Sequence, residues 1–138
     1  HRWLFHTEFP GKIGERIHFL LHGVHHVHPS DPLRLVMPPL MSLPLMTLAY
    51  VVIAAPFPAP ISYTVTAGFL VGYVLYDEIH FHIHHRAPRT KIEQTLRRAH
   101  LLHHFRDPDR GYGVSCPYWD SAFGTGYTKD DKPGEKPV

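Results

Sequence analysis

Clustered histidines are the side chains of this sequence best suited to chemistry. Ten of the fourteen histidines fall into four groups along the chain. Imidazole nitrogen is a common metal ligand, and ten imidazoles are enough to hold two ions with four or five ligands each. The sequence therefore predicts a two-metal site, with candidate ligands His1, His6, His22, His25, His26, His80, His84, His100, His103 and His104.

Helical spacing predicts how these groups could meet. Residues three or four apart lie on one face of a helix, whereas residues two apart point in nearly opposite directions. The groups at 22–26, 80–84 and 100–104 contain the first spacing, so three helices could point imidazoles at a common centre. His1 and His6 are five apart and would have to reach the metals from a helix end or a bend.

The four remaining histidines lie outside these groups. His82 faces away from the ligand face of its segment and is expected to be structural or to lie at the lipid interface. His28 is expected to end a helix. His18 lies one turn before the second group and His85 directly follows the third, so spacing leaves open whether either ligates a metal.

Ligand type narrows the chemistry without choosing the metal, since imidazole suits iron, zinc, copper and nickel. The single cysteine, Cys116, excludes a cysteine-rich site, and the Glu-x-x-His pairs of soluble di-iron bundles are missing. A structural zinc site needs only four ligands. An iron pair beside a membrane would suit oxidation of unactivated C–H bonds, which redox-inert zinc cannot perform.

One long uncharged segment predicts two membrane-spanning helices. Residues 35–76 contain no charged side chain. As one helix this segment would be about 63 Å long, roughly twice the hydrocarbon thickness of a bilayer. The PFPAP sequence at 56–60 favours a reversal near the midpoint. We expect spans over 35–55 and 61–76, the second being short unless its helix continues toward His84.

A transmembrane hairpin returns the chain to the side of the membrane that it left. The second and third histidine groups would then share one side with many basic residues, whereas the hairpin turn carries no charge. The positive-inside rule places that side in the cytoplasm. The predicted fold is all-α and integral to the membrane, with a cytosolic histidine-rich helical cap holding a dinuclear metal site. The alternative is a buried helical pair in a soluble protein.

Longer motifs around the histidines resemble a known family. They are HRWLFH (1–6), HFLLHGVHHVHPSDPLRLVMPP (18–39), YDEIHFHIHH (76–85), RRAHLLHH (97–104) and GYGVSCPYWDSAFGT (111–125). Together they resemble the fatty acid 2-hydroxylase branch of the fatty acid hydroxylase (sterol desaturase-like) superfamily. The histidine motifs indicate the superfamily, while PSDPLRLVMPP, GYGVS and WDSAFGT favour the branch. The resemblance implies the same ten ligands and does not extend ligation to His18 or His85.

The resemblance implies an O2-dependent monooxygenase that hydroxylates the C2 (alpha) carbon of long-chain fatty acids or of sphingolipid acyl groups. It implies two metal ions per chain, functionally di-iron, although zinc could occupy the sites in structures. An external electron donor, cytochrome b5-like or ferredoxin-like, is expected. The site would face the cytoplasm at the endoplasmic reticulum membrane in eukaryotes or the inner membrane in bacteria.

Three alternatives stay open at this point. A sterol desaturase, C-4 methylsterol oxidase or carotenoid hydroxylase of the same superfamily would share the histidine motifs. A haem-binding membrane electron carrier would need paired ligands on facing membrane helices. A metal transporter would call for ionisable side chains within the spans, and residues 35–76 offer only hydroxyl groups. The net charge of +2 is dispersed along the chain and gives no support for nucleic-acid binding.

Some expectations concern the chain ends and single side chains. Because the chain begins inside a histidine motif without methionine, we expect residues 1–138 to be an N-terminally truncated fragment of one catalytic domain. The charged segment 128–138 is expected to be a disordered tail. Asp77 is placed to hydrogen-bond a ligand imidazole, or is an ordinary interface charge. The aromatic residues of 112–127 could line an acyl entrance or form an interfacial belt.

Overall fold

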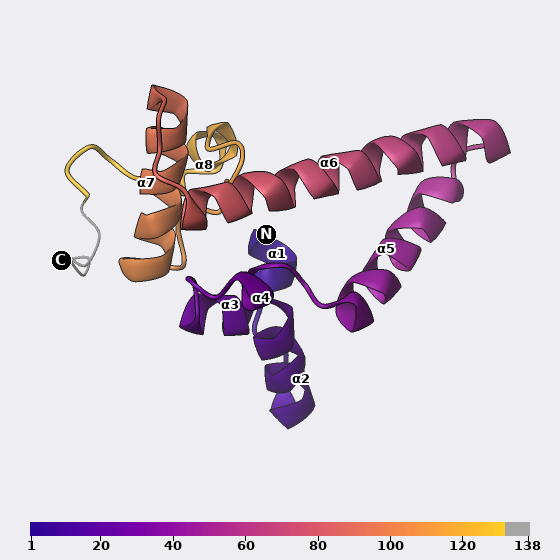
Figure 1. Ribbon diagram of the computed structural model, residues 1–138. Helices are drawn as coiled ribbons and strands as arrows, with labels where there is room; N and C mark the ends of the chain where they lie inside the picture. The colour runs from indigo at the N-terminus through magenta and orange to yellow at the C-terminus, as the bar shows by residue number, and fades with distance from the viewer. Residues whose placement is uncertain (132–138) are drawn as a thin grey trace.

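The computed structural model describes residues 1–131, and all regular elements in that range are helical (Figure 1). Two of the helices are long and apolar, and the shorter ones gather around one end of the longest, as the sequence predicted. In chain order the elements are α1 (Arg2–Phe5), α2 (Gly11–His18), the π-helical turn η1 (Phe19–Gly23), α3 (Val24–Val27), α4 (Pro32–Leu35), α5 (Pro39–Ala54), α6 (Ala59–His85), α7 (Lys91–Phe105) and α8 (Tyr118–Ala122).

The hairpin consists of α5 packed against α6. The stretches Pro32–Ala54 and Ala59–His85 are both long and apolar enough to cross a membrane. The chain reverses in the proline-rich turn between the two helices, where the sequence predicted it. Most side chains of the pair face outward, which suits contact with lipid.

The boundaries of the two spans differ from those expected from sequence. The first continuous helix begins at Pro39 and not at residue 35, because α4 ends at Leu35 and Pro38 adopts an extended backbone that precedes the new helix. Pro44 is accommodated inside α5. The second helix does not stop at Tyr76 but continues to His85, the extension that the short second span made possible.

The length of α6 places its histidines just beyond the apolar stretch. Its uncharged part, residues 59–76, rises about 27 Å, close to the thickness of a bilayer core. His80 follows one turn later, about 6 Å further along the axis. A single rigid helix therefore links the membrane-spanning segment to the histidine cap.

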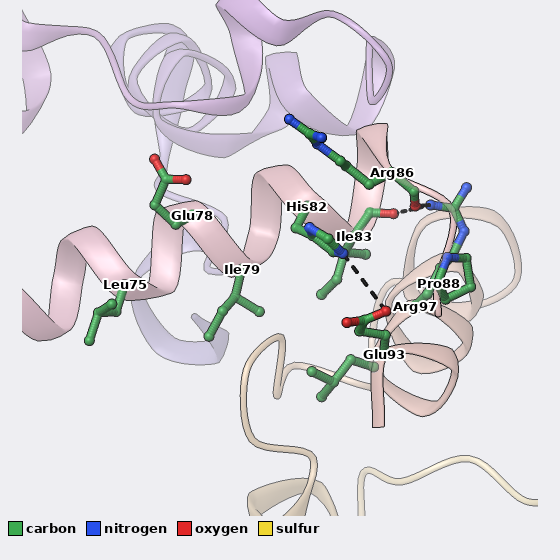
Figure 2. Close-up of a pocket in the computed structure, with 10 residues that line it drawn as sticks. Leu75, Glu78, Ile79, His82, Ile83, Arg86, Pro88, Glu93 and Arg97 are labelled. Carbon is green, nitrogen blue, oxygen red and sulfur yellow. Dashed lines mark hydrogen bonds and ion pairs between the residues drawn. The ribbon is translucent and has the colours of Figure 1, made fainter. Parts of the chain in front are cut away.

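The junction between α6 and α7 is held by capping interactions. Thr90 and Glu93 form a capping box at the start of α7, each side chain accepting a backbone N–H of the other residue. The Arg97 guanidinium donates to the carbonyl oxygens of Ile83 and Arg86 at the end of α6, the second at 2.9 Å (Figure 2). These bonds fasten α7 across the end of α6, where both helices carry histidines.

The buried interior of the cap contains imidazoles where most small domains have aliphatic side chains. The buried hydrophobic residues are Leu35, Ile83, Leu102 and Val114. The buried histidines are His22, His25, His80, His100 and His103. The stability of such an interior depends on which hydrogen-bond partners or bound ions the ring nitrogens have, because buried polar atoms without a partner are costly.

The beginning of the segment expected to be disordered is tied to α7. The Arg98 guanidinium donates to the carbonyl oxygens of Thr128 at 2.7 Å and Lys129 at 3.1 Å. Asp131 forms an ion pair with Arg106 at 2.8 Å. Residues 128–131 are therefore fastened to the cap, and residues 132–138 of that expectation lie outside the described part of the chain.

Candidate metal centre

The structure brings the ten predicted histidines together in two sets of five. The first histidine group is His1, His6, His22, His26 and His103, and the second histidine group is His25, His80, His84, His100 and His104. In each group, one ring nitrogen from every histidine lies within 4.8 Å of the corresponding atoms of the other four. Convergence from distant parts of the chain, the central structural prediction, is thus observed.

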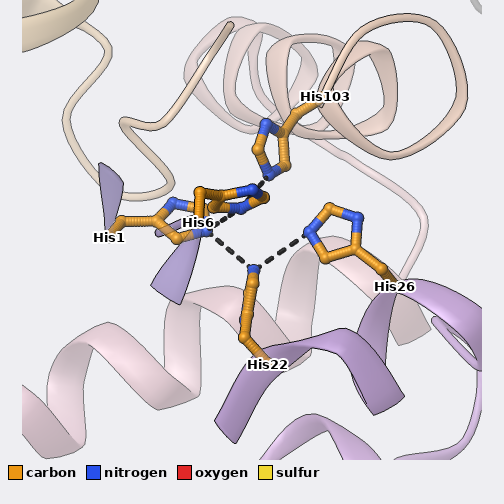
Figure 3. Close-up of side chains that lie close together, drawn as sticks. All are labelled: His1, His6, His22, His26 and His103. Atoms are coloured by element: carbon orange, nitrogen blue, oxygen red, sulfur yellow. Dashed lines mark hydrogen bonds between the residues drawn. The ribbon is translucent and has the colours of Figure 1, made fainter. Parts of the chain in front are cut away.

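The first group is assembled from both ends of α1, from the π turn, from α3 and from α7 (Figure 3). His1 and His6 occupy the two cap positions of α1, so they reach the centre from helix ends as their five-residue spacing required. The Nε2 atoms of His1 and His22 are 2.9 Å apart, and those of His6 and His103 are 3.0 Å apart.

The second group is assembled from α3, α6 and α7. The Nε2 atom of His100 lies 2.8 Å from those of both His80 and His84, and 3.0 Å from that of His104. Within the described residues, neither ring nitrogen of the buried His25 has a hydrogen-bond partner. Buried polar atoms are rarely left unsatisfied, so these nitrogens indicate a ligand.

Neighbouring histidines in the sequence serve different groups. His25 belongs to the second group and His26 to the first, while His103 belongs to the first and His104 to the second. Adjacent residues on a helix diverge by about 100°. Each HH pair thus reaches two centres at once, and the closest of these rings, His26 and His104, have centroids 4.3 Å apart.

The spacing of the nitrogens fits metal coordination. Two imidazole nitrogens at about 2.1 Å from one ion are about 3.0 Å apart at right angles and about 4.2 Å apart when opposite. Neighbouring Nε2 atoms within each group lie 2.8–3.2 Å apart, which matches adjacent coordination positions. Five donors around each centre fit one ion each, with room for a further ligand.

A proton is a poor substitute for a metal ion at these centres. Burial, and to a smaller extent neighbouring imidazoles, lower the pKa of His6, His25 and His103 to about 3. The rings are therefore neutral at physiological pH, the form in which imidazole binds metals. Neutral nitrogens facing one another at hydrogen-bond distance favour a shared cation.

Backbone carbonyls orient two ligands of the first group. The Nδ1 atom of His1 donates to the carbonyl oxygen of Tyr112 at 2.7 Å, and the Nδ1 atom of His103 donates to that of Arg110 at 2.6 Å. A proton on Nδ1 leaves the Nε2 lone pair free for a metal. Sequence reasoning missed this loop, which is tied in turn to the buried carboxylate of Asp120.

The other histidines lie where the sequence predicted or where it left the question open. His28 caps the end of α3. His82 lines a pocket between α6 and the start of α7, where its Nε2 atom lies 3.9 Å from the carboxylate of Glu93 (Figure 2). His85 stacks on Phe81, with ring centroids 4.3 Å apart. His18 lines a separate cavity. All four are outside both histidine groups.

Asp77 is engaged on its own helix. Its carboxyl group lies beside the side chain of Tyr73, one turn earlier in α6. Asp120 is the carboxylate whose partners lead to candidate ligands, and the only sequence signal for it was its place in the WDSAFGT motif.

A cavity of about 500 Å³ lies beside the first histidine group. Its lining includes His1 of that group and Tyr76 near the end of the apolar part of α6. The aromatic side chains of Trp3, Trp119 and Phe123 also line it, with the Trp3 and Phe123 rings 5.7 Å apart. The cavity is therefore lined both by exposed aromatic rings and by a candidate ligand.

Comparison with known proteins identifies the family. A sequence model of the fatty acid hydroxylase family matches residues 1–125. The chain belongs to the fatty acid hydroxylase family.

Several characterised relatives are 2-hydroxylases, in agreement with the branch that the motifs favoured. Dihydroceramide fatty acyl 2-hydroxylase FAH2 of Arabidopsis thaliana is 43% identical over 129 residues, covering 91% of this chain and 53% of the relative. Ceramide very long chain fatty acid hydroxylase SCS7 of Saccharomyces cerevisiae is 42% identical over 139 residues, or 99% of this chain and 36% of the relative. Fatty acid 2-hydroxylase of Homo sapiens is 38% identical, with coverage of 91% and 34%.

A solved structure shares the fold. It is described as full-length scs7p with only the hydroxylase domain visible, and it superimposes with a TM-score of 0.87 at 40% identity, covering 98% of this chain and 52% of that one. The chain spans about half the length of FAH2 and about a third of the human relative.

Proposed function

We propose that the protein is a membrane oxygenase that hydroxylates C2 of long-chain fatty acids or of sphingolipid acyl groups, with two metal ions held by the ten histidines. The observation that carries this proposal is the convergence of two five-imidazole groups at the end of a membrane-spanning helix. The relatives named as fatty acid and ceramide hydroxylases support the substrate class. A haem protein would instead pair imidazoles on facing spans.

The reaction we propose consumes one O2, two electrons and two protons, inserts one oxygen atom into the C2–H bond and releases the other as water. A bound pair of iron ions would supply the O2 activation that such a bond requires, and zinc could occupy the same imidazoles without supporting it. The chain contributes neutral, buried ring nitrogens in two fixed sets. It also excludes bulk water from His100 and His103, whose side chains are at most 1% exposed.

The cavity beside the first group is the proposed site for the reacting end of the substrate. Its aromatic rim, formed by Trp3, Trp119 and Phe123, could admit an acyl chain from the lipid phase. His1 lies in its wall, so a substrate that entered with its carboxyl end first would bring C2 near the first histidine group. A metal centre just outside the apolar stretch thus suits oxidation at C2 and disfavours mid-chain positions.

We propose that the cap faces the cytoplasm. The basic residues that flank the hairpin lie on the cap side, and the turn between α5 and α6 has no charge, the distribution typical of a cytosolic cap. They are Arg34, Arg86, Arg89, Lys91, Arg97 and Arg98. An external donor of the cytochrome b5 or ferredoxin type would deliver electrons from that side, at the endoplasmic reticulum membrane in eukaryotes or the inner membrane in bacteria.

Lipid mass spectrometry of cells that express the protein tests the proposal. Wild-type protein should produce 2-hydroxy acyl species, and His103→Ala should abolish them because one ligand of the first group is lost. His28→Ala is the matched control, since His28 is exposed and outside both groups, and should retain product. Hydroxylation at another carbon would contradict the regiochemistry, and unchanged product in His103→Ala would contradict the ligand assignment.

A further inference from the structure

Asp120 is a buried carboxylate that is connected to the first histidine group through hydrogen bonds of the backbone at residues 110–113. Its side chain is 4% exposed and lies in the short helix α8. Its Oδ1 accepts the backbone N–H of Tyr112 at 2.8 Å and the hydroxyl of Thr125 at 2.7 Å. Its Oδ2 accepts the backbone N–H of Gly113 at 2.8 Å. Three donors thus satisfy a carboxylate that has no cationic partner among these contacts.

The loop that Asp120 holds is the loop that orients two candidate ligands. The carbonyl oxygen of Tyr112, whose N–H binds Asp120, accepts the Nδ1 proton of His1 at 2.7 Å. Two residues earlier, the carbonyl oxygen of Arg110 accepts the Nδ1 proton of His103 at 2.6 Å. Both histidines belong to the first group. The chain of bonds therefore runs from a carboxylate through the backbone to two imidazoles.

A glycine in this loop allows the backbone to lie directly against the carboxylate of Asp120. A Cβ atom on Gly113 would lie 2.6 Å from Oδ2 of Asp120 and 2.5 Å from the carbonyl oxygen of Cys116, so glycine is required there. A second tie comes from Thr125, whose carbonyl oxygen accepts the N–H of Gly111 at 2.8 Å. The loop and the end of α8 thus form one hydrogen-bonded unit.

The second histidine group lacks an equivalent support among the described residues. The buried Nδ1 atoms of His100 and His104 have no hydrogen-bond partner there, and neither does either ring nitrogen of His25. The two groups are therefore supported differently, although each supplies five imidazoles.

We propose that Asp120 is a positioning residue for the first histidine group, and that it controls the occupancy of that centre and not of the second. This inference rests on the proposed metal ligation. Partners that orient metal-bound histidines typically affect metal affinity by roughly 10- to 100-fold. Asp120→Asn keeps the volume but turns an amide N–H₂ toward donors, so the loop loses at least one of its three bonds.

Metal content of the purified, detergent-solubilised protein, measured at a series of buffered free Fe²⁺ or Zn²⁺ concentrations, tests the inference. Wild type should fill two equivalents. Asp120→Asn should keep one wild-type equivalent, while the other fills only at roughly 10- to 100-fold higher free metal. Asp131→Asn is the matched control, because Asp131 is also buried, accepts the N–H of Thr128 at 2.6 Å and lies outside the loop at 110–113. It should retain both equivalents.

Double variants identify which centre is weakened. Asp120→Asn combined with His22→Ala should lose no more metal than His22→Ala alone, since both changes act on the first group. Asp120→Asn combined with His100→Ala should weaken both centres. A general loss of folding would not produce this pattern. If Asp120→Asn fails to fold, Thr125→Val removes a single bond to the carboxylate, and Thr125→Ser should restore the wild-type titration.

The outcomes separate the two proposals. Wild-type protein that binds no metal at any concentration would overturn the metal ligation itself. Two wild-type equivalents in Asp120→Asn, or equal weakening of both in that variant, would overturn only the role of Asp120. Selective loss of one equivalent with an intact second supports it.

Discussion

The hairpin and the cap of this protein reverse the usual relation between polarity and burial. In the hairpin, apolar side chains such as Leu48, Val52 and Val71 are more than half exposed, and α5 has no buried residue. In the cap, imidazoles such as His100 and His103 are almost completely buried. The hairpin needs a lipid phase to cover its apolar side chains, and in the proposed function the buried imidazoles of the cap need a pair of metal ions.

The hairpin and the cap are therefore stabilised by different interactions. The hairpin satisfies its backbone hydrogen bonds within its own helices and depends on the bilayer to cover its side chains. The cap has few buried aliphatic side chains, so in the proposed enzyme bound metal ions would add to the free energy of unfolding of the cap. Perturbations should therefore act on the two regions independently.

Loss of one ligand in the cap should have the largest effect. His100 contacts three other ligands of the second group through its Nε2 atom, and its side chain is 1% exposed. His100→Ala should reduce hydroxylase activity to background and metal content from two equivalents to one, while membrane insertion is unchanged. Product mass spectrometry, elemental analysis and membrane fractionation measure the three quantities. His85→Ala, outside both groups, should match wild type in all of them.

Acid should destabilise the metal-free cap next most strongly. Burial lowers the pKa of His103 to about 3 and also lowers the pKa values of His22 and His100 below 6.5. Below pH 6.5 the unfolded chain thus binds more protons than the folded one, so stability is complete above pH 6.5 and is lost as the pH falls toward 3. Each such histidine lowers the free energy of unfolding by about 1.4 kcal/mol for every pH unit between 6.5 and its pKa in the folded protein.

Thermal unfolding of chelated protein, followed by near-ultraviolet circular dichroism, should show a Tm several degrees lower at pH 5.5 than at pH 7.5. The hairpin supplies the internal control, because residues 35–76 contain no group that titrates in this range. The helical signal that remains in the far ultraviolet after the cap has unfolded should be the same at both pH values. A Tm that rises on acidification would contradict the neutral, buried state of these histidines.

The sequence was enough to predict which ten histidines converge and where the hairpin lies, but not how the histidines divide into two groups. A spacing of four residues correctly grouped His22 with His26 and His100 with His104, because helical periodicity is local. A spacing of three was misleading, since His22 and His25 lie in different groups, as do His100 and His103. Spacing could not show that His25 and His26 serve different centres, since that depends on where α6 and α7 cross. The π turn at Phe19–Gly23 also changes the register between His18 and the later histidines, and the sequence has no clear signal for it.

Asp120 escaped prediction for a related reason. Its partners are backbone groups of residues 112 and 113, and the link to His1 and His103 passes through two carbonyl oxygens. Backbone contacts between segments leave no periodic pattern in the sequence. The positions of side chains on regular helices could therefore be predicted from the sequence. The hydrogen bonds from an irregular loop to His1 and His103 could be found only in the structure.

A charge placed in the hairpin should have the third largest effect and should spare the cap. Val71 is 59% exposed on α6, within the apolar stretch. Val71→Lys should disfavour membrane insertion by about 3 kcal/mol, the cost of lysine near the centre of a spanning helix. The matched change Ile92→Lys, at a 73% exposed position on α7, should be neutral because that helix belongs to the cap. Alkaline extraction of membranes measures the inserted fraction, and equal insertion of both variants would argue against a membrane-spanning α6.

Loss of a helix cap should have the smallest effect and should again distinguish the two regions. The Thr90 hydroxyl accepts the N–H of Glu93 at 3.2 Å at the start of α7. Thr90→Ala should cost about 1 kcal/mol and lower the Tm of the cap by a few degrees. Thr47 also uses its hydroxyl, donating to the carbonyl oxygen of Leu43 at 2.8 Å, but that oxygen already takes part in α5. Thr47→Ala should therefore leave the Tm within experimental error, and a larger shift for Thr47→Ala than for Thr90→Ala would show that cap stability does not depend on how α7 begins.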